Sequence, residues 1–513
     1  MEKQSKYNIL GLLLIIAAGY GIYQYNILDQ FPEIAFEGEE VARRQCGYCH
    51  QFPTPDLLDK ETWENGVLPE MGRRLGVKNT GFDPFKDLSE GEAQTIRLLD
   101  VYPEDSLVSD HDWKTIVDYY VSLAPDTLQK ASEMIIVSEN EAPFQSHFIE
   151  IESKEIPEVT VLHYDSISRE LYIGDNDQLF ALNSQGEFSS RWSLTSPAVD
   201  LGISGDGRLH LLTIGSVPPS DHKAGAFGVT QAEGSIDFTM VLDRLPRPVH
   251  FVLADLDSDQ KEDVIICGFG HHDGELAWYS QLQDKHVLNE NPGSRIAVVN
   301  DMNQDGLPDI VVLMAQAQEG VDIYYNEGKG NFSKERVLEF SPVHGVSYLE
   351  LHDFNADGFP DLLISNGDNW DFSSIEKPYH GIRIYLNDGN NNFEESYFYP
   401  MNGCNKAIAR DFDLDGDMDI AAISFYDHLD NPEKSFVYLE NTGDFLFVVH
   451  YISEAASGKW LTMEVGDFDQ DGYQDLFLGS YFHNVAEWTR LVSAGATTFP
   501  EVLYLQNATM MIE

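Results

Sequence analysis

The sequence predicts a multidomain chain with three parts: an N-terminal membrane anchor helix, an all-α domain, and an all-β domain built from seven four-stranded repeats. Three observations predict it. Residues 8–23 are almost continuously apolar, the motif Cys46-Gly47-Tyr48-Cys49-His50 follows a stretch of helical composition, and five nine-residue acidic loops recur among alternating strands. At 513 residues the chain is too long for one compact core, which also favours several folded parts.

Residues 1–30 are predicted to be a signal anchor. Lys3 and Lys6 precede the apolar run, and a cluster of tyrosines suited to a membrane interface ends it. No small-x-small cleavage site follows, which favours an uncleaved anchor over a removed signal peptide. We therefore expect the membrane as a partner and the rest of the chain on the periplasmic side of a bacterial inner membrane, with secretion as the alternative.

The net charge excludes one class of partner. The chain has 32 basic and 86 acidic residues, a formal charge of −54. Nucleic acid binding needs a concentrated basic surface that displaces counterions from phosphates. We therefore expect no nucleic acid partner, and we expect bound metal ions to compensate part of the acidic charge.

Residues 31–130 are predicted to bind haem. Cys46 and Cys49 would add to the haem vinyl groups, while His50 is held where its imidazole reaches the iron. This motif resembles that of mono-haem cytochromes c, and the resemblance implies one covalent haem c, electron transfer and a redox partner protein. A redox dithiol or half of a zinc site are alternatives, but neither explains the His directly after the second Cys.

Met71, in Val67-Leu-Pro-Glu-Met-Gly72, is the predicted sixth iron ligand, because a thioether after a proline-fixed turn can be presented to iron and raises its reduction potential. His111 and Met134 are the alternatives. A helical pattern over residues 112–122 resembles the C-terminal helix of the same kind of domain. Residues 131–144 are expected to be a linker, and the two remaining cysteines, Cys267 and Cys404, are expected to be buried thiols.

The five acidic loops predict calcium sites. Oxygen-bearing side chains recur at positions 1, 3, 5 and 9, position 7 would add a backbone carbonyl, and Gly at position 6 allows a sharp turn around a hard cation. The first loop has Gln260 in place of that Gly, which predicts weaker binding. Strands rather than helices follow, and no Glu stands at position 12, so these are not EF-hands. We expect about four or five Ca²⁺ ions, held by Asp255, Asp257, Asp259, Asp263, Asp301, Asn303, Asp305, Leu307, Asp309, Asp353, Asn355, Asp357, Phe359, Asp361, Asp411, Asp413, Asp415, Asp417, Asp419, Asp467, Asp469, Asp471, Tyr473 and Asp475.

The strands around the loops predict a propeller over residues 145–513. Each loop follows an alternating strand and precedes an apolar one such as Asp361-Leu-Leu-Ile-Ser365, and this pattern occurs seven times, the first two without calcium ligands. It resembles the FG-GAP or VCBS repeats of seven-bladed β-propellers, the architecture of integrin heads. The last blade lacks an outer strand, and we predict that Phe148–Glu152 fills this place, because an unpaired edge would otherwise be exposed.

Residues at the propeller face opposite the calcium loops are candidates for ligand binding. A chain with few basic residues places several of them before the first strands of its blades, beside aromatic residues. We expect an anionic or sugar ligand there, bound by Arg295, His344, Trp370, Lys406, Lys459 and Tyr481. A transition metal bound by four histidines is an alternative that would make the propeller an enzyme: His271, His272, His428 and His483.

These features together predict a membrane-anchored periplasmic c-type cytochrome that transfers electrons, with a calcium-stabilised propeller as a docking or ligand-binding platform. The first alternative is a periplasmic oxidoreductase whose propeller binds a small polar or sugar substrate and passes electrons to the haem. The second is an adhesion or carbohydrate-binding protein. Motifs for a nucleophile elbow, a phosphate-binding loop or a zinc-protease helix are not present in the sequence.

Overall fold

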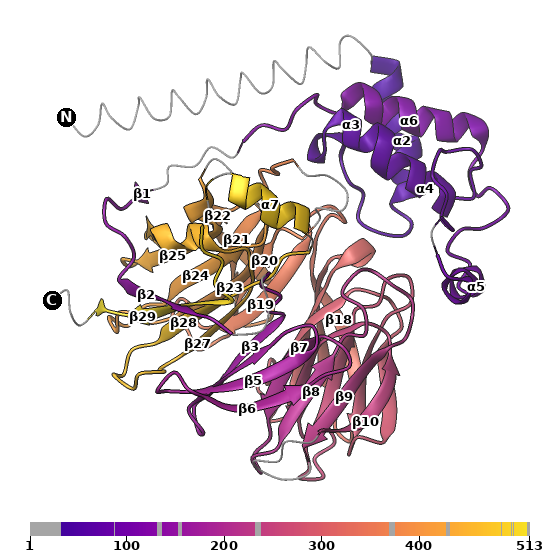
Figure 1. Cartoon of the computed structure of the whole chain (residues 1–513). Coiled ribbons are helices and arrows are strands. Elements are labelled where there is room, and N and C mark those ends of the chain that lie inside the picture. Colours follow the sequence, from indigo (N-terminus) through magenta and orange to yellow (C-terminus); the bar gives the residue numbers. More distant parts are fainter. Residues whose placement is uncertain are drawn as a thin grey trace. The chain divides into compact units, whose positions relative to one another are not determined.

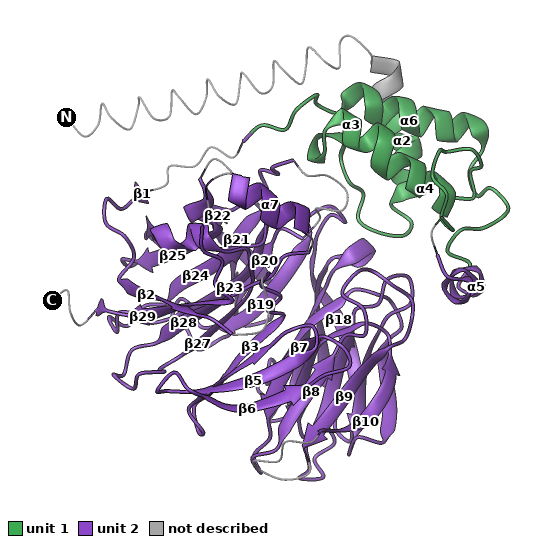
Figure 2. Ribbon diagram, viewed as in Figure 1, with its two compact units in different colours: residues 1–87, 100–129 green, residues 88–99, 130–513 purple. Residues whose placement is uncertain are grey.

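The computed structural model describes residues 32–86, 88–130, 136–151, 156–230, 238–368, 375–426, 431–483, 485–493, 495 and 497–509. The chain divides into two compact units, which Figure 2 colours separately. The first contains residues 1–87 and 100–129, and the second contains residues 88–99 and 130–513.

The second unit contains a seven-bladed β-propeller (Figure 1). Its described strands form seven sheets, each with four antiparallel strands, and a short parallel strand β1 (Ile136–Val137) adds to the sixth. The first strands of successive blades contact one another, and β27 of the last blade contacts β3 of the first. The ring of blades is therefore closed.

The strands of the first three blades are β3 (Val161–Asp165), β4 (Glu170–Gly174), β5 (Gln178–Asn183), β6 (Phe188–Ser193); β7 (Ala198–Ile203), β8 (Leu209–Thr213), β9 (Gly225–Thr230), β10 (Phe238–Leu245); β11 (Pro248–Ala254), β12 (Asp263–Gly268), β13 (Glu275–Ser280) and β14 (Asp284–Asn289). Those of the next three are β15 (Ser294–Asn300), β16 (Asp309–Met314), β17 (Gly320–Asn326), β18 (Phe332–Glu339); β19 (Val346–His352), β20 (Asp361–Asn366), β21 (Gly381–Asn387), β22 (Phe393–Pro400); β23 (Cys404–Arg410), β24 (Asp419–Ser424), β25 (Phe436–Asn441) and β26 (Phe447–His450). The seventh blade consists of β27 (Trp460–Gly466), β28 (Asp475–Ser480), β29 (Val502–Asn507) and β2 (Phe144–Ile149).

The second strand of each calcium-loop blade is buried along its whole length, as in β16, β20 and β24. This burial explains the continuous apolar runs in the sequence, because a strand in the middle of a blade packs against neighbouring blades on both faces. One such interface joins blades six and seven through Phe412, Phe436, Trp460 and Leu476. Cys267 and Cys404 are both fully buried thiols, as predicted.

The ring closes through β2, as predicted. This strand pairs antiparallel with β29, from Phe144 opposite Asn507 to Ile149 opposite Val502. It begins at Phe144 instead of the expected Phe148, because Phe144 is buried and packs edge-on against the rings of Phe412 and Tyr438. The fourth strand of the last blade therefore comes from a segment that precedes the first blade in sequence.

The core of the second blade contains a histidine in an apolar setting. His210 on β8 is 3% exposed, its ring lies near those of Phe227 and Phe251, and neither ring nitrogen has a hydrogen-bond partner among the described residues. Burial lowers the pKa of His210 to about 4. The residue is therefore neutral in the folded protein and becomes charged only well below neutral pH.

We expect the stability of the propeller to fall as pH falls from about 6.5 to 4, because unfolded His210 takes up a proton in this range and the folded form resists it. The shift predicts a loss on the order of 2 kcal/mol. Urea unfolding at pH 7 and pH 4.5 measures it, and the variant His210→Leu should lose this part of the dependence. Substituting His147, which is exposed on β2, is the control; equal pH dependence of wild type and His210→Leu would reject the assignment.

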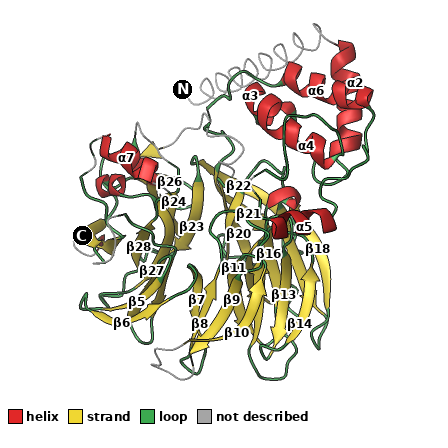
Figure 3. Ribbon diagram, turned by 45° about the vertical axis from the view of Figure 1, so that its right-hand side comes forward, coloured by secondary structure: helices red, strands yellow, loops and turns green. Residues whose placement is uncertain are grey.

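The described helices of the first unit are short: α2 (Pro32–Cys46), η1 (Pro55–Leu57), α3 (Lys60–Thr62), the π-helical turn η2 (Trp63–Val67), α4 (Leu68–Arg74) and α6 (Asp110–Leu123). Within this unit α2 packs against α6. Helix α5 (Glu90–Leu98) groups with the propeller instead, where Ser220 Oγ donates to Glu92 Oε1 at 2.6 Å. Figure 3 colours the helices of the chain red and its strands yellow.

The predicted fold class is wrong beyond the propeller. An anchor helix and an all-α cytochrome c domain were expected, whereas the structure is a seven-bladed propeller with few helices. Gly76, Gly81 and Pro84 lie between α4 and α5, where the described residues form turns and no helix, and α5 groups with the propeller. The anchor prediction, residues 1–30, lies outside the described residues, and within those residues no helix is long and apolar enough to cross a membrane.

Candidate functional site

The Cys-x-x-Cys-His motif lies at the C-terminal end of α2. Cys46 is the last residue of the helix, and the backbone N–H of Gly47 donates to the Arg43 carbonyl at 3.1 Å, which tightens the last turn. Both thiols are free. Cys46 is half-buried and Cys49 is exposed, while Tyr48 between them is 90% exposed. Both cysteines are therefore presented on one turn.

His50 is oriented by the chain that follows it. Its Nδ1 lies 2.9 Å from the carbonyl oxygen of Gln51. A carbonyl can only accept, so Nδ1 carries the proton and Nε2 keeps its lone pair. Burial lowers the pKa of His50, and the nearby charge of Arg74 lowers it further. A neutral imidazole with a free Nε2 lone pair is the form that binds a metal.

Aromatic rings lie next to the motif. The rings of Trp63 and Tyr120 are 4.3 Å apart, and both rings are anchored by hydrogen bonds to backbone carbonyls, from Trp63 Nε1 to Pro55 at 2.9 Å and from the Tyr120 hydroxyl to Pro53 at 2.7 Å. Burial raises the pKa of Cys46 to about 11, although a hydrogen bond with Tyr120 opposes the shift. A thiol that stays protonated at neutral pH is a poor redox nucleophile, so burial lowers the reactivity of Cys46.

The predicted sixth ligand, Met71, is half-buried on α4, the same helix that brings Arg74 close to His50. Of the two alternatives, His111 is exposed in the first turn of α6, and Met134 lies outside the described residues. Met71 therefore lies on the helix whose Arg74 charge acts on His50, and the role of Met71 as a ligand stays a prediction.

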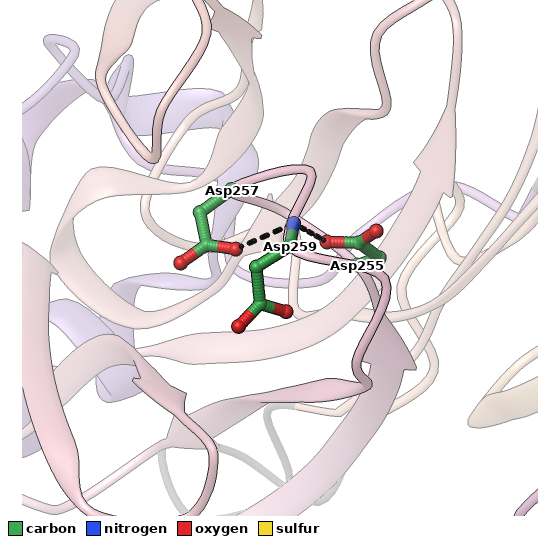
Figure 4. Close-up of side chains that lie close together, drawn as sticks. All are labelled: Asp255, Asp257 and Asp259. Carbon is green, nitrogen blue, oxygen red and sulfur yellow. Dashed lines mark hydrogen bonds between the residues drawn. The ribbon is translucent and has the colours of Figure 1, made fainter.

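The acidic loops fold around their own carboxylates. In the first loop, the backbone N–H of Asp259 donates to Asp255 Oδ1 and to Asp257 Oδ1, both at 3.1 Å (Figure 4). In the second, the N–H of Asp305 donates to Asp301 Oδ1 and to Asn303 Oδ1, both at 3.0 Å. Positions 1, 3 and 5 are therefore drawn together by one backbone N–H.

Two residues of each acidic loop, at positions 4 and 6, have a left-handed backbone conformation. Position 4 has φ between 57° and 64° in every loop, and it is never glycine: Ser258, Gln304, Ala356, Leu414 and Gln470. Position 6 has φ between 87° and 105° where it is glycine, as in Gly306 and Gly416, and 67° at Gln260. The first loop therefore has the same conformation as the other four, but with a strained side chain at position 6.

We expect Gln260→Gly to stabilise the protein by about 1 kcal/mol and to strengthen calcium binding in the first loop, because it removes a side chain from a left-handed position. Chemical unfolding with and without calcium measures both effects. The matched control is Gly306→Gln in the second loop, which should have the opposite effect. A neutral or destabilising Gln260→Gly would show that Gln260 is not strained.

The aspartate at position 9 is structural as well as a candidate ligand. In the second loop, Asp309 is fully buried, Oδ2 accepts the N–H of Met302 at 2.9 Å, and Oδ1 accepts the N–H of Asn326 at 2.7 Å. Asp361, Asp419 and Asp475 make the same two backbone contacts in their own blades. This carboxylate therefore ties position 2 of its loop to the end of the third strand.

Carboxylate oxygens without partners make the loops suitable for a cation. In the described part of the chain, three loops bring acidic oxygens within 4.8 Å of one another, in groups of Asp255, Asp257 and Asp259; Asp411, Asp413 and Asp415; and Asp467, Asp469 and Asp475. Asp411 Oδ1 and Asp467 Oδ1 are buried there without a hydrogen-bond partner. Burial raises the pKa of Asp419 to about 7 and that of Asp475 to about 6, with neighbouring aspartates adding to both shifts. All-oxygen ligands and uncompensated charge fit a hard divalent cation.

The corresponding turns of the first two blades are satisfied without a metal. In the second blade, Asp206 accepts from Ser204 Oγ at 2.6 Å and from Arg208 Nε at 2.7 Å, so a guanidinium provides the positive charge. In the first, Asp165 caps the backbone N–H groups of Ile167 and Ser168 at 3.1 and 2.8 Å. These two turns are natural controls for the acidic loops.

The predicted ligand-binding residues are largely engaged within the protein. Arg295 pairs with Asp368 at 3.7 Å, and Lys459, which is buried, pairs with Glu487 at 2.9 Å. Tyr481 is buried, and burial lowers the pKa of His344 to about 4, so it adds no positive charge at neutral pH. Trp370 lies outside the described residues.

Lys406 differs from these cations. It extends over the Tyr348 ring at 4.8 Å and has no ion pair among the described residues. The transition-metal alternative gains no support, because the described histidines form no metal-binding cluster and His428 lies outside the described residues.

The fold and the loops together define a seven-bladed propeller with FG-GAP-like repeats. The family model of the FG-GAP-like repeat matches residues 301–364 and 411–478, which include four of the five acidic loops.

 The loop that begins at Asp255 lies outside the match. The chain thus contains FG-GAP-like repeats.

Several solved structures have limited similarity to this chain. The crystal structure of the N-terminal domain of Nup159 has 12% identity and a TM-score of 0.42, over 74% of this chain and 99% of that one. The WD40 domain of Neurospora crassa Pan2 has 8% identity and a TM-score of 0.41, over 68% and 88%. An Agrocybe aegerita lectin described as recognising terminal N-acetylglucosamine has 15% identity and a TM-score of 0.37, over 70% and 92%. At these TM-scores the similarities carry no argument about function.

Proposed function

We propose that this protein is a c-type haem protein that transfers electrons, with a calcium-stabilised propeller as the platform that binds its redox partner. The observation that carries the proposal is the arrangement at the end of α2. Two free thiols on one turn are followed by a neutral His50 whose Nδ1 is held by a backbone carbonyl, which leaves Nε2 for iron.

The surroundings of the motif bear on the reactivity of its thiols. Burial raises the pKa of Cys46, which disfavours its thiolate, and Tyr120, whose ring lies 4.3 Å from that of Trp63, is hydrogen-bonded to this thiol. Cys46 and Cys49 would hold the haem through thioethers, His50 would be its first axial ligand and Met71 its second. The bound haem supplies reversible one-electron chemistry, and these residues attach it and tune its potential.

Calcium is the second part of the proposal. The buried, unpartnered oxygens of Asp411 and Asp467 and the raised pKa values of Asp419 and Asp475 indicate loops that lack a positive charge. Calcium would neutralise them and hold successive strands together. The acidic surface implies a redox partner with a basic face, because opposite charges steer protein association.

The test of haem attachment is expression with haem maturation, followed by absorption spectroscopy and mass spectrometry. We expect about one covalent haem per chain, and none in a variant with both Cys46→Ala and Cys49→Ala. His50→Ala should change the absorption spectrum of the haem, because the iron loses its first axial ligand. Met71→Ala should leave the sixth coordination position of the iron to other ligands and lower the reduction potential of the haem. Tyr48→Ala, which changes an exposed residue inside the motif, is the control and should keep the haem. A wild-type chain without covalent haem would contradict the proposal.

A further inference from the structure

Asparagines at the ends of third strands connect neighbouring acidic loops. Asn326 is 2% exposed at the end of β17. Its Nδ2 donates to the carbonyl of Pro308 in its own loop at 3.1 Å and to the carbonyl of Leu256 in the preceding blade's loop at 2.9 Å. Its backbone N–H donates to Asp309 Oδ1 at 2.7 Å. One buried side chain thus touches two acidic loops.

The same bridge recurs between the last two blades. Asn507 is also 2% exposed, and its Nδ2 donates to Gln474 in its own loop at 3.2 Å and to Phe412 in the preceding loop at 2.8 Å. Between the loops that begin at Asp301 and Asp353 two asparagines make the bridge. Asn387 at the end of β21 donates through Nδ2 to the carbonyl of Pro360 in its own loop and to Asn391 Oδ1, both at 3.1 Å, and Asn391 Nδ2 donates to the carbonyl of Met302 at 3.0 Å. In all three cases the acceptor is the carbonyl at position 2 of the preceding loop.

One junction lacks the bridge. Asn441 at the end of β25 corresponds to Asn326 and Asn507, and its backbone N–H donates to Asp419 Oδ1 at 2.8 Å. Its Nδ2 donates to Met418 in its own loop at 3.3 Å, and the described residues show no bond from it to the preceding loop. The loops that begin at Asp353 and Asp411 are therefore not joined in this way.

The bridge ends on a peptide that also belongs to the loop's own network. At position 2, Met302 and Phe412 donate their N–H to the position 9 aspartate of the same loop, at 2.9 and 3.2 Å. A cation that orders the loop also fixes this peptide, and with it the carbonyl that holds the next blade's asparagine. Because the bond is buried, leaving it unmade is unfavourable, so ordering one loop favours ordering of the next.

We propose that calcium binds in two cooperative groups. The first group is the loops that begin at Asp255, Asp301 and Asp353, and the second is those that begin at Asp411 and Asp467. Within a group the asparagine bridges couple the sites, and between groups the missing bridge at Asn441 leaves them independent. This inference rests on the calcium part of the proposed function.

The experiment is a calcium titration of full-length protein stripped of metal, in two backgrounds that keep two loops each. In each background, the loops to be removed carry Asn in place of Asp at position 1, which removes one carboxylate ligand. Asp255→Asn, Asp301→Asn and Asp353→Asn together keep the bridged pair, whereas Asp255→Asn, Asp301→Asn and Asp467→Asn keep the unbridged pair. We expect positive cooperativity in the bridged pair, with binding at one site strengthening the other by about 5-fold or more, and independent binding in the unbridged pair.

Adding Asn507→Ala to the bridged pair should abolish the cooperativity, whereas adding Asn441→Ala should preserve it. If Asn507→Ala does not fold, Asn326→Ala tests the equivalent bridge in a background that keeps the loops at Asp255 and Asp301. Calcium binding without cooperativity in the bridged pair, or equal cooperativity in both pairs, would overturn the coupling alone. A wild-type protein that binds no calcium would overturn the calcium proposal itself.

Discussion

Removing calcium should lower the melting temperature of the propeller by on the order of 10 °C or more. When the free calcium concentration is a hundred times the Kd of a site, binding at that site adds about 2.7 kcal/mol to the free energy of unfolding, and the contributions of several sites add up. Without the cation, the clustered carboxylates in the loops that begin at Asp411 and Asp467 repel one another, and Asp411 Oδ1 and Asp467 Oδ1 have no hydrogen-bond partner among the described residues. Melting followed by circular dichroism in calcium and in excess chelator measures the difference.

Two variants separate a calcium effect from a general one. Asp467→Asn removes a position 1 carboxylate and should reduce both the calcium bound and the chelator-sensitive part of the melting temperature. Asp206→Asn changes the second blade, where Arg208 already provides the positive charge, and should leave calcium binding unchanged. The absorption spectrum of the haem should not respond to chelator. An unchanged melting temperature after complete calcium removal would refute structural calcium.

Phe144→Ala should destabilise the propeller by about 3 kcal/mol, because it removes a buried aromatic ring from the strand that closes the ring of blades. The Phe144 ring packs against Phe412 and Tyr438 at centroid distances of 5.9 and 5.5 Å. Deleting residues 144–149 should have a larger effect, because it also exposes the edge of β29. Denaturant unfolding measures both.

Phe148→Ala is the matched control for this prediction. Phe148 lies on the same strand, β2, but is 43% exposed. We expect a loss well below that of Phe144→Ala, since little apolar surface becomes exposed. If the two variants were equally destabilised, or if the deletion left the unfolding transition unchanged, β2 would not be the strand that closes the propeller.

The sequence predicts the propeller well because its repeats impose a strong pattern. The nine-residue loops mark the turn between first and second strands, and the apolar runs that follow are the fully buried strands β16, β20 and β24. The closing strand is also predicted, because an open edge on β29 must be paired. Its starting point is not, since only the fold brings Phe144 against Phe412.

The helical part was predicted less well. A Cys-x-x-Cys-His motif specifies a local attachment site and not the arrangement of the helices around it. Residues 88–99 illustrate the difference: the sequence suggests nothing to separate them from the haem segment, yet α5 groups with the propeller through Ser220 and Glu92. Local helix signals do not encode such tertiary contacts.

The candidate sites show a similar division. Ligand spacing within a loop is local, so the carboxylates are found from sequence, but the second role of Asp309 and the bridge from Asn326 join segments that only the fold brings together. The Asn-x-Gly pattern at Asn326 does not predict that bridge, because among the described residues Asn441 has the same pattern without the bridge and Asn507 has the bridge without the Gly. Arg295 and Lys459 were predicted to bind a ligand, but both have acidic partners within the protein, which the sequence alone does not reveal.

We propose that one chain carries both a haem and structural calcium. Plasma mass spectrometry of the purified, haem-matured protein tests it most directly. We predict about one iron and about four or five calcium ions per chain, with no other metal in stoichiometric amount. Absence of iron or of calcium, or stoichiometric copper or another transition metal, would contradict the claim.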